Sequence, residues 1–241
     1  MRHLGERAAL TDIGRRRTVN QDALLAGERL FAVADGVGGG PGGEVAARLA
    51  VDALSSDART LGDLRVLAAD ASDAVYDAGA ADESLTGMAT TLTAGLFLPD
   101  GRLGVVHAGD SRLYRLRGRV LEQLTSDHAL VAQLLADGLV TPERALTHPL
   151  RNMLTRALGR DRDTDYDTFA VDAEPGDVFL FCTDGLTKMV DDQQIAALVG
   201  DAISLEAAAV ELVRGANIAG GRDNVTVVLA APPAVESRAA A

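Results

Sequence analysis

Four short apolar segments follow one another between Met88 and Leu124, each separated from the next by only a few turn-forming residues. Segments joined by such short turns pair as antiparallel strands, because a parallel pair needs a crossover of about a dozen residues or more. We therefore predict a meander of antiparallel strands at 89–98, 103–108, 112–117 and 120–124. This arrangement favours an α+β fold over a doubly wound parallel α/β fold.

The remaining elements are also grouped by type. Apolar residues at a helical period predict helices at 44–57, 61–80 and 129–137, and one that begins at Ser204. Short apolar runs bounded by turns predict strands at 7–13, 23–26, 30–34, 166–171, 177–182 and 225–231. The irregular segment 138–165 is long enough to be functional or mobile. We expect one domain over 1–231 and a disordered tail or linker at 232–241.

The charge of the chain limits its partners. The 241 residues carry a formal net charge of −12, which disfavours attraction to nucleic acid or an anionic membrane. No apolar run is long enough for a membrane span, and the N-terminus lacks the pattern of a signal peptide. The single cysteine, Cys182, excludes an internal disulfide framework. A cytoplasmic protein that makes no contact with nucleic acid or membrane is expected.

A glycine-rich stretch from Asp35 to Glu44 lies between an apolar run and an amphipathic pattern, which predicts a strand, a tight turn and a helix. A carboxylate at a strand end followed by glycines is a common way to build a phosphate or metal site. The same residues also suit an ordinary Asp-Gly turn. This stretch alone leaves the two interpretations open.

Four aspartates stand where a predicted strand meets a glycine turn: Asp35, Asp110, Asp184 and Asp223. Each alone is explained as a turn residue, but together they would repel one another at a sheet edge unless a cation were bound. Oxygen ligands without His or Cys point to Mg²⁺ or Mn²⁺. Two such ions, roughly 3.5–4 Å apart, can activate a water for attack on a phosphate ester.

Such a reaction also needs a cation that orients the phosphate, for which a guanidinium is suited. Arg15, Arg16 and Arg17 lie in a polar loop next to Asp22 and supply candidates. Three adjacent arginines are more often part of a solvated surface loop. The loop alone does not decide between these two interpretations.

Six motifs occur in order: Arg17-Thr18-Val19-Asn20-Gln21-Asp22, Ala34-Asp35-Gly36-Val37-Gly38-Gly39, Gly87-Met88-Ala89-Thr90-Thr91, Gly109-Asp110-Ser111-Arg112, Cys182-Thr183-Asp184-Gly185 and Asp223-Asn224-Val225-Thr226. In this combination the chain resembles the metal-dependent protein phosphatases of the 2C type, in their bacterial branch, from about residue 10 to residue 228. The resemblance implies a four-layer α-β-β-α sandwich, in which two antiparallel sheets are flanked by helices and the metals sit at one end.

Carried over position by position, the resemblance implies a set of metal ligands. Asp35 would bridge two ions, and Gly36 would give its backbone carbonyl to one of them. Asp184 and Asp223 would complete the other ion. Asp110, together with Asp184, would help to hold a third, weaker ion. The resemblance thus implies two Mn²⁺ or Mg²⁺ ions, with a third possible.

Other positions acquire roles in the same way. Arg17 would hold the substrate phosphate, and Asn224 would support the neighbouring ligand Asp223. Residues 138–165 correspond to the family's flap, which lies near the site and shapes the choice of protein substrate.

The chain departs from the family pattern at two positions. Many members have Glu where this chain has Gln21, and a neutral amide holds a divalent ion less strongly, so the second ion would be weaker or reached through water or Asp22. Eukaryotic members often have His, proposed as the general acid, where this chain has Val37. An acid would then come from elsewhere, such as metal-bound water; His148 is a candidate, although a lone His in a loop is more often solvated.

Two rival hypotheses come from other classes of protein. Residues 38–43 formally match the G-x-G-x-x-G pattern of dinucleotide-binding folds, with Asp63 at about the expected distance, but the antiparallel strands argue against that fold. A pseudophosphatase that acts only by binding would typically lack a metal carboxylate, whereas Asp35, Asp184 and Asp223 are all present. Gln21 keeps this second rival open.

The sequence therefore predicts a metal-dependent serine/threonine phosphatase in which hydroxide between the metals attacks phosphorus directly. We expect a monomer that acts on phosphorylated proteins and opposes a Ser/Thr kinase. Cys182 follows an apolar strand and is expected to be buried instead of nucleophilic.

Overall fold

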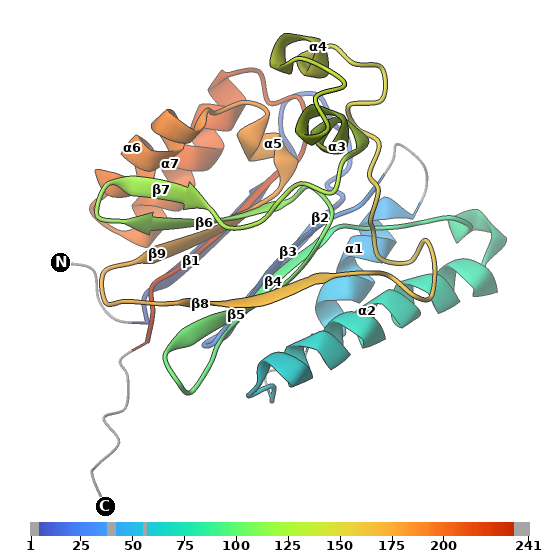
Figure 1. Cartoon of the computed structure of the whole chain (residues 1–241), viewed down its shortest axis with the longest axis horizontal. Coiled ribbons are helices and arrows are strands. Elements are labelled where there is room, and N and C mark those ends of the chain that lie inside the picture. Colours follow the sequence, from blue (N-terminus) through green and yellow to red (C-terminus); the bar gives the residue numbers. More distant parts are fainter. Residues whose placement is uncertain (1–4, 38–41, 55–56, 234–241) are drawn as a thin grey trace, which may run out of the picture.

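The computed structural model describes residues 5–37, 42–54 and 57–233. Two five-stranded sheets face each other, and helices cover both outer faces (Figure 1). The first sheet has the order β1 (Arg7–Asp12), β10 (Val225–Ala230), β9 (Val178–Cys182), β6 (Arg112–Arg117) and β7 (Val120–Gln123). The second has the order β2 (Asp22–Ala26), β3 (Leu30–Asp35), β4 (Leu92–Phe97), β5 (Arg102–Ala108) and β8 (Asp167–Asp172).

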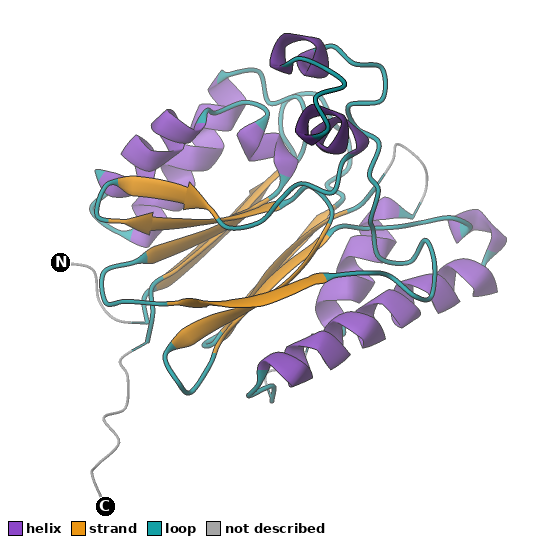
Figure 2. Ribbon diagram, viewed as in Figure 1, coloured by secondary structure: helices purple, strands orange, loops and turns teal. Residues whose placement is uncertain are grey.

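The helices lie in three groups (Figure 2). Those on the outer face of the second sheet are α1 (Gly43–Asp52) and α2 (Leu61–Ala81), with the 3₁₀ turn η1 (Glu83–Leu85) after them. Those on the outer face of the first sheet are α5 (Asp184–Thr187), α6 (Asp192–Gly200) and α7 (Leu205–Ile218). The short helices α3 (Leu130–Ala136) and α4 (Pro142–Leu146) lie together at one end of the sandwich.

Alternation along the strands builds three apolar layers between these four layers of structure. In β3, Phe31 and Val33 face the opposite sheet, whereas Leu30 and Ala32 pack with α1 and α2. In β9, Phe179 and Phe181 enter the same central layer, and the intervening residues face α6 and α7. A strand that is apolar on both faces has to be covered on both sides, which a four-layer sandwich achieves. The predicted α+β sandwich of two antiparallel sheets is confirmed.

Several predicted boundaries agree with the structure. The hairpin of β2 and β3 was predicted within one residue at each end, and α2 shows the expected buried stripe that includes Leu64, Ala68 and Val75. The helix expected from Ser204 is capped by that side chain, whose Oγ accepts a hydrogen bond from the Ala207 N–H at 3.2 Å. The helix predicted at 44–57 begins at Gly43 and ends at Asp52.

The predicted meander is wrong at one connection. β5 pairs with β4 and β8, while β6 pairs with β7 and β9 in the other sheet. The chain crosses between the sheets over 109–111, where Gly109 has φ +116° and packs against Thr91: a Cβ there would lie 2.5 Å from Thr91 Cγ2. A short connection was taken for a hairpin, but a glycine with positive φ lets the chain leave one sheet and enter the other. Asp110 is placed at this crossing.

Two further differences concern the start of β4 and three helices that were not predicted. The strand predicted at 89–98 begins only at Leu92, because Thr90 instead bridges Gly36 on one side and Leu158 on the other. Helices α4, α5 and α6 were not predicted, although α6 has a capping box in which Asp191 and Gln194 bond each other's backbone N–H.

Of the tail expected at 232–241, Pro232 accepts a hydrogen bond from the Gly5 N–H, and residues 234–241 lie outside the described residues. Across the ranges that the structure describes, none of the helices combines the length and the hydrophobicity needed to cross a bilayer.

Candidate active site

A cavity of about 210 Å³ is lined by the residues to which the family resemblance assigned metal, phosphate-binding or supporting roles, except Asp22. Its lining consists of Arg17, Gln21, Asp35, Gly36, Val37, Thr91, Asp110, Asn152, Leu154, Asp184, Lys188, Asp223 and Asn224. These residues come from both sheets and from the segment 138–165. The aspartates and Arg17 therefore converge on one cavity, as expected.

Asp35 ends β3, and its backbone forms two hydrogen bonds with Thr91, the residue before β4. Its backbone N–H donates to Thr91 Oγ1 at 2.9 Å, and its carbonyl accepts from the Thr91 N–H at 2.9 Å. Gly36 follows, and a Cβ at this position would lie 2.3 Å from the Gly43 carbonyl oxygen. Only glycine lets the turn after β3 approach the start of α1 this closely.

Asp184 and Asp223 belong to adjacent parts of the first sheet. Asp184 is the first residue of α5, directly after β9, and Asp223 lies two residues before β10. A Cβ at Gly185 would lie 1.8 Å from the Asn224 carbonyl oxygen, so the start of α5 rests directly on the strand beside it. This close approach explains why Asp-Gly follows the strand.

Asp22 lies behind the cavity. It is the register partner of Asp35 across the β2–β3 pair. Its Oδ2 accepts hydrogen bonds from Thr183 Oγ1 at 2.9 Å and from Thr226 Oγ1 at 2.7 Å. Its Oδ1 is buried, with no hydrogen-bond partner in the described part of the chain. Asp22 therefore links the two sheets beneath the site.

The carboxylates of the site disfavour one another's charge. Burial, reinforced by the charges of Asp22 and Asp184, raises the pKa of Asp35 well above its usual value. Burial and then the charge of Asp184 raise the pKa of Asp110 to about 7. For Asp22, burial is again the main cause, and its pKa rises to about 7. Such a group of acids is stable in the charged form only when cations lie close by.

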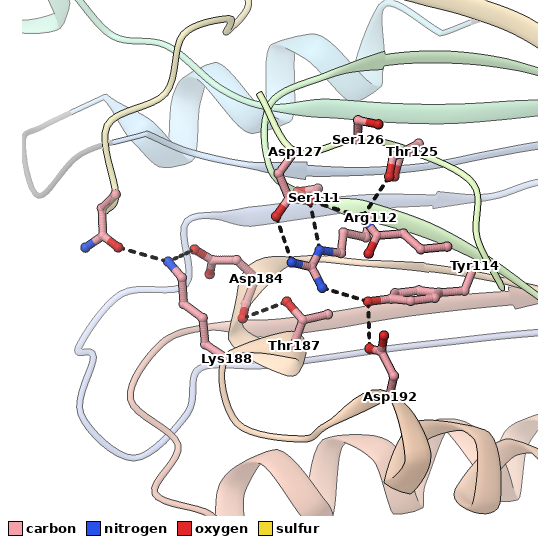
Figure 3. Close-up of polar contacts among 12 residues, drawn as sticks. Ser111, Arg112, Tyr114, Thr125, Ser126, Asp127, Asp184, Thr187, Lys188 and Asp192 are labelled. Atoms are coloured by element: carbon pink, nitrogen blue, oxygen red, sulfur yellow. Dashed lines mark hydrogen bonds and ion pairs between the residues drawn. The ribbon is translucent and has the colours of Figure 1, made fainter. Parts of the chain in front are cut away.

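Two cations of the chain meet these acids. Arg17 Nη2 lies 2.7 Å from Asp223 Oδ2. Lys188, one helical turn after Asp184, forms an ion pair with that carboxylate (Figure 3). Its Nζ also donates to Asn152 Oδ1 at 3.2 Å. Arg17 was expected in the site, but Lys188 and Asn152 were missed. The i, i+4 spacing of Asp184 and Lys188 could have indicated the first, had α5 been predicted.

Asn224 anchors the loop that carries Arg17. Its Oδ1 accepts from the Gln21 N–H at 2.8 Å, and its Nδ2 donates to the carbonyls of Ile13 and Val19 at 3.0 Å each. One amide thus holds three backbone groups of the loop against the start of β10. The support of Asp223 expected from Asn224 stays a prediction: the Asn224 side chain bonds the loop, whereas its backbone N–H donates to Asp223 Oδ1 at 2.9 Å.

The two positions that depart from the family pattern are also placed. The Gln21 side chain packs against Gly43, where a Cβ would lie 2.7 Å from its Nε2. Val37 lines the cavity and donates its N–H to the Ala89 carbonyl at 2.8 Å. His148 is not among the residues that line the cavity; its Nδ1 accepts a hydrogen bond from the Leu150 N–H at 3.2 Å.

A second polar network stiffens the neighbouring strand end. Arg112 binds both carboxylate oxygens of Asp127 at 2.8 and 2.7 Å and donates to the Tyr114 hydroxyl at 2.9 Å (Figure 3). Tyr114 in turn donates to Asp192 Oδ1 at 3.1 Å. This chain of contacts connects the start of β6 to α6, and it fixes the strand that follows Asp110.

The donor atoms of the site are of the type that a hard divalent cation prefers. Within residues 5–37, 42–54 and 57–233, no three His, Cys, Asp or Glu side chains are grouped closely enough to hold an ion in their present conformations. The donors are nevertheless all oxygens, and Asp184 Oδ1 is buried with no hydrogen-bond partner among the described residues. An unpartnered buried carboxylate oxygen is the kind of atom that a Mg²⁺ or Mn²⁺ ligand requires.

The fold and this site together define an α-β-β-α sandwich with an acidic cavity at one end. A protein phosphatase 2C family model matches residues 13–214. The protein phosphatase PhpP of Streptococcus pneumoniae is 38% identical over 238 residues, which cover 93% of this chain and 96% of PhpP. The chain belongs to the protein phosphatase 2C family, in its bacterial branch of serine/threonine phosphatases, as the motifs predicted.

Solved structures agree with this assignment. The serine/threonine phosphatase PstP/Ppp of Mycobacterium tuberculosis matches with a TM-score of 0.87 and 38% identity, over 95% of this chain and 98% of that chain. The catalytic domain of PstP in complex with two manganese ions matches with a TM-score of 0.86 and 38% identity, over 94% and 97% of the two chains. The dinucleotide-binding alternative does not fit, because β3 is antiparallel to both of its neighbours.

Proposed function

We propose that this protein is a divalent-metal-dependent phosphatase that hydrolyses phosphoserine and phosphothreonine in other proteins. The observation that carries the proposal is the convergence of Asp35, Asp184, Asp223 and Arg17 on one cavity. The family membership and the names of PhpP and PstP support it. The presence of all three core carboxylates counts against a purely binding role.

We assign the metal ligands as Asp35, the Gly36 carbonyl, Asp184 and Asp223, with Asp22 and Gln21 behind or beside them. The PstP catalytic domain with two manganese ions supports a site for two ions, and we propose Mn²⁺ or Mg²⁺. Two bound divalent ions would neutralise the phosphoryl oxygens and activate a water for direct in-line attack on phosphorus. The like charges that raise the pKa of Asp35 would then be compensated.

The chain's own groups would bind and orient the substrate. The Arg17 side chain is 41% exposed and reaches Asp223 at the cavity, so its guanidinium is available for a bidentate contact with the phosphate dianion. Asn224 would keep the Arg17 loop in register by the three hydrogen bonds described above. We regard Arg17 as the phosphate-binding group and Asn224 as a positioning residue.

A thiol mechanism does not suit the site. Cys182 is fully buried, and this burial raises the pKa of its thiol to about 12. A thiolate at neutral pH is therefore disfavoured. Because Val37 has no proton to transfer and His148 does not line the cavity, neither supplies the general acid from this position.

We also propose a setting for the enzyme. Residues 1–231 would form one catalytic domain, and the flap of residues 138–165, which brings Asn152 and Leu154 to the cavity, would influence the choice of protein substrate. We propose that the enzyme is a monomer in the cytoplasm and that it opposes a Ser/Thr kinase in signalling.

The test is phosphate release from a phosphothreonine peptide, with Mn²⁺ and with a chelator. Wild type should release phosphate only with metal, and Asp184→Asn should lose activity severely. Asp70→Asn, which changes an exposed carboxylate on α2, is the matched control, and Cys182→Ser should largely keep its turnover. Release by Asp184→Asn at the wild-type rate, or its loss in Cys182→Ser alone, would contradict the proposal.

A further inference from the structure

Lys188 is the only lysine in the sequence, and the rest of the 23 lysine and arginine residues are arginines. This single ammonium lies in the cavity, at the C-cap of α5. An ammonium is a compact point charge with three donors, whereas a guanidinium is a broad planar fork. Lys188 brings this compact positive charge into contact with Asp184 inside the acidic cavity.

The contacts of Lys188 divide the two oxygens of Asp184. Its Nζ pairs with Asp184 Oδ2, while Oδ1 of the same carboxylate is buried and has no hydrogen-bond partner within the described residues (Figure 3). One oxygen is thus neutralised by the chain itself. The other remains for a cation in the core of the site.

The charge of the Lys188 ammonium also acts on Asp110. Burial and then the charge of Asp184 raise the pKa of Asp110, and the charge of Lys188 acts in the opposite direction. Lys188 thus lines the same cavity as the two acids that the resemblance would assign to a third, weaker ion, and it forms an ion pair with one of them, Asp184. A divalent ion at this place would have to lie against the ammonium or expel it, and the two positive charges repel each other.

Lys188 also connects this end of the site to the flap. Its Nζ donates to Asn152 Oδ1 at 3.2 Å, and Asn152 itself lines the cavity. The short tether of an i, i+4 pair keeps the ammonium close to Asp184. The same group therefore neutralises a carboxylate and contacts the loop above it.

We propose that Lys188 acts as a built-in cation at the Asp110–Asp184 end of the site, in place of a third divalent ion, and holds Asn152 of the flap there. The inference rests on the two-ion site proposed above. It makes Lys188 a positioning residue that leaves the chain with a fixed charge where an exchangeable ion would otherwise bind.

The experiment counts Mn²⁺ ions bound per chain by equilibrium dialysis up to millimolar free Mn²⁺. Wild type is compared with Lys188→Asp, which adds a ligand, and with Lys188→Met, which removes the charge at similar length. Lys188→Asp should bind one Mn²⁺ more than wild type, and Lys188→Met should gain a weaker additional site. Asn152→Ala should bind the wild-type number, because it leaves the ammonium on Asp184.

Circular dichroism of each variant checks that it is folded, and the Lys188→Met result stands in if Lys188→Asp is not. Equal numbers for wild type and both folded Lys188 variants, or a third ion in wild type, would overturn the inference. Phosphate release is measured separately on the same samples. An absence of release by wild type contradicts the proposed function, whereas equal ion counts with normal release contradict only the role of Lys188.

Discussion

Asp22 and Asp35 are register partners at the open end of the β2–β3 hairpin, so their two carboxylates project from directly opposite positions. The charge of Asp22 acts on Asp35, and the charge of Asp184 acts on both. Like charges placed opposite each other destabilise a strand pair. The folded protein therefore maintains an unfavourable electrostatic arrangement at the centre of its proposed metal site.

Asp35→Asn should raise the stability of the metal-free protein while removing metal-dependent activity. The substitution deletes one of the crowded charges and retains the shape of the side chain. We expect a gain on the order of 1 kcal/mol, or ~2–4 °C in Tm for a chain of this size, measured by thermal unfolding in chelator. Asp70→Asn on the exposed face of α2 should leave Tm unchanged, and a lower Tm for Asp35→Asn would contradict the electrostatic argument.

Arg17→Ala should weaken substrate binding and turnover together. A hydrogen bond to a charged group contributes about 1.5–3 kcal/mol, so we expect a loss of roughly 10- to 100-fold in kcat/KM. The measurement is steady-state hydrolysis of a phosphothreonine peptide in Mn²⁺. Arg16→Ala, which changes the preceding and also exposed residue of the same loop, is the matched control. Equal losses in both variants would mean that the loop contributes only general charge.

Asn224→Ala should lower Mn²⁺ affinity or activity by about 10- to 100-fold, the range typical when a partner behind a metal ligand is removed. The reason is the loss of its hydrogen bonds to the Gln21 N–H and to the carbonyls of Ile13 and Val19. Mn²⁺ titration and peptide hydrolysis report the two effects. Gln193→Ala, an exposed amide on α6, should change neither.

His107 should make the protein sensitive to acid. Burial, together with the charge of His128, lowers the pKa of His107 to about 4, against about 6.5 when unfolded. Its ring contacts Thr93 Oγ1 and the Ser126 carbonyl, and the charges of Asp167 and Asp127 act the other way. Between these two pKa values the unfolded state binds more protons, so stability is complete above pH 6.5 and falls as the pH falls.

The loss attributable to His107 has an upper limit of about 3 kcal/mol, from the pKa difference. Urea unfolding at pH 7 and at pH 5 measures the part of this loss that falls between pH 6.5 and pH 5, which is about 2 kcal/mol. His107→Gln should show a smaller fall between the two pH values than wild type. The remaining fall has a source in His128, whose pKa is also lowered by burial. An identical fall in wild type and His107→Gln would contradict the assignment.

Much of the site could be predicted because its signals are local. The carboxylates at 35 and 184 stand next to glycines that allow close backbone approach, Asp223 lies two residues after Gly221, and each of the three follows or precedes an apolar strand. The capped start of α7 at Ser204 is local in the same way. Six such motifs in order were sufficient for the family, and the family membership was then confirmed.

Other features depended on contacts between distant residues. The sequence did not reveal that the chain changes sheets at Gly109, that Asp22 lies behind Asp35 under two threonines, or that Lys188 meets Asn152 of the flap. At Gly109 the next strand could pair in either sheet, and both lie equally close along the chain. The other two contacts join residues that are far apart in the sequence, so no local pattern predicts them.

The sequence by itself thus determined which residues end strands, which faces are apolar and which acids stand beside glycines. Only the tertiary structure decided which strands pair and which charges meet. The physical reason is that a turn or a helix cap is satisfied by neighbours within a few residues. Strand pairing and ion pairing depend instead on how all the apolar faces are covered at once, which no single segment encodes.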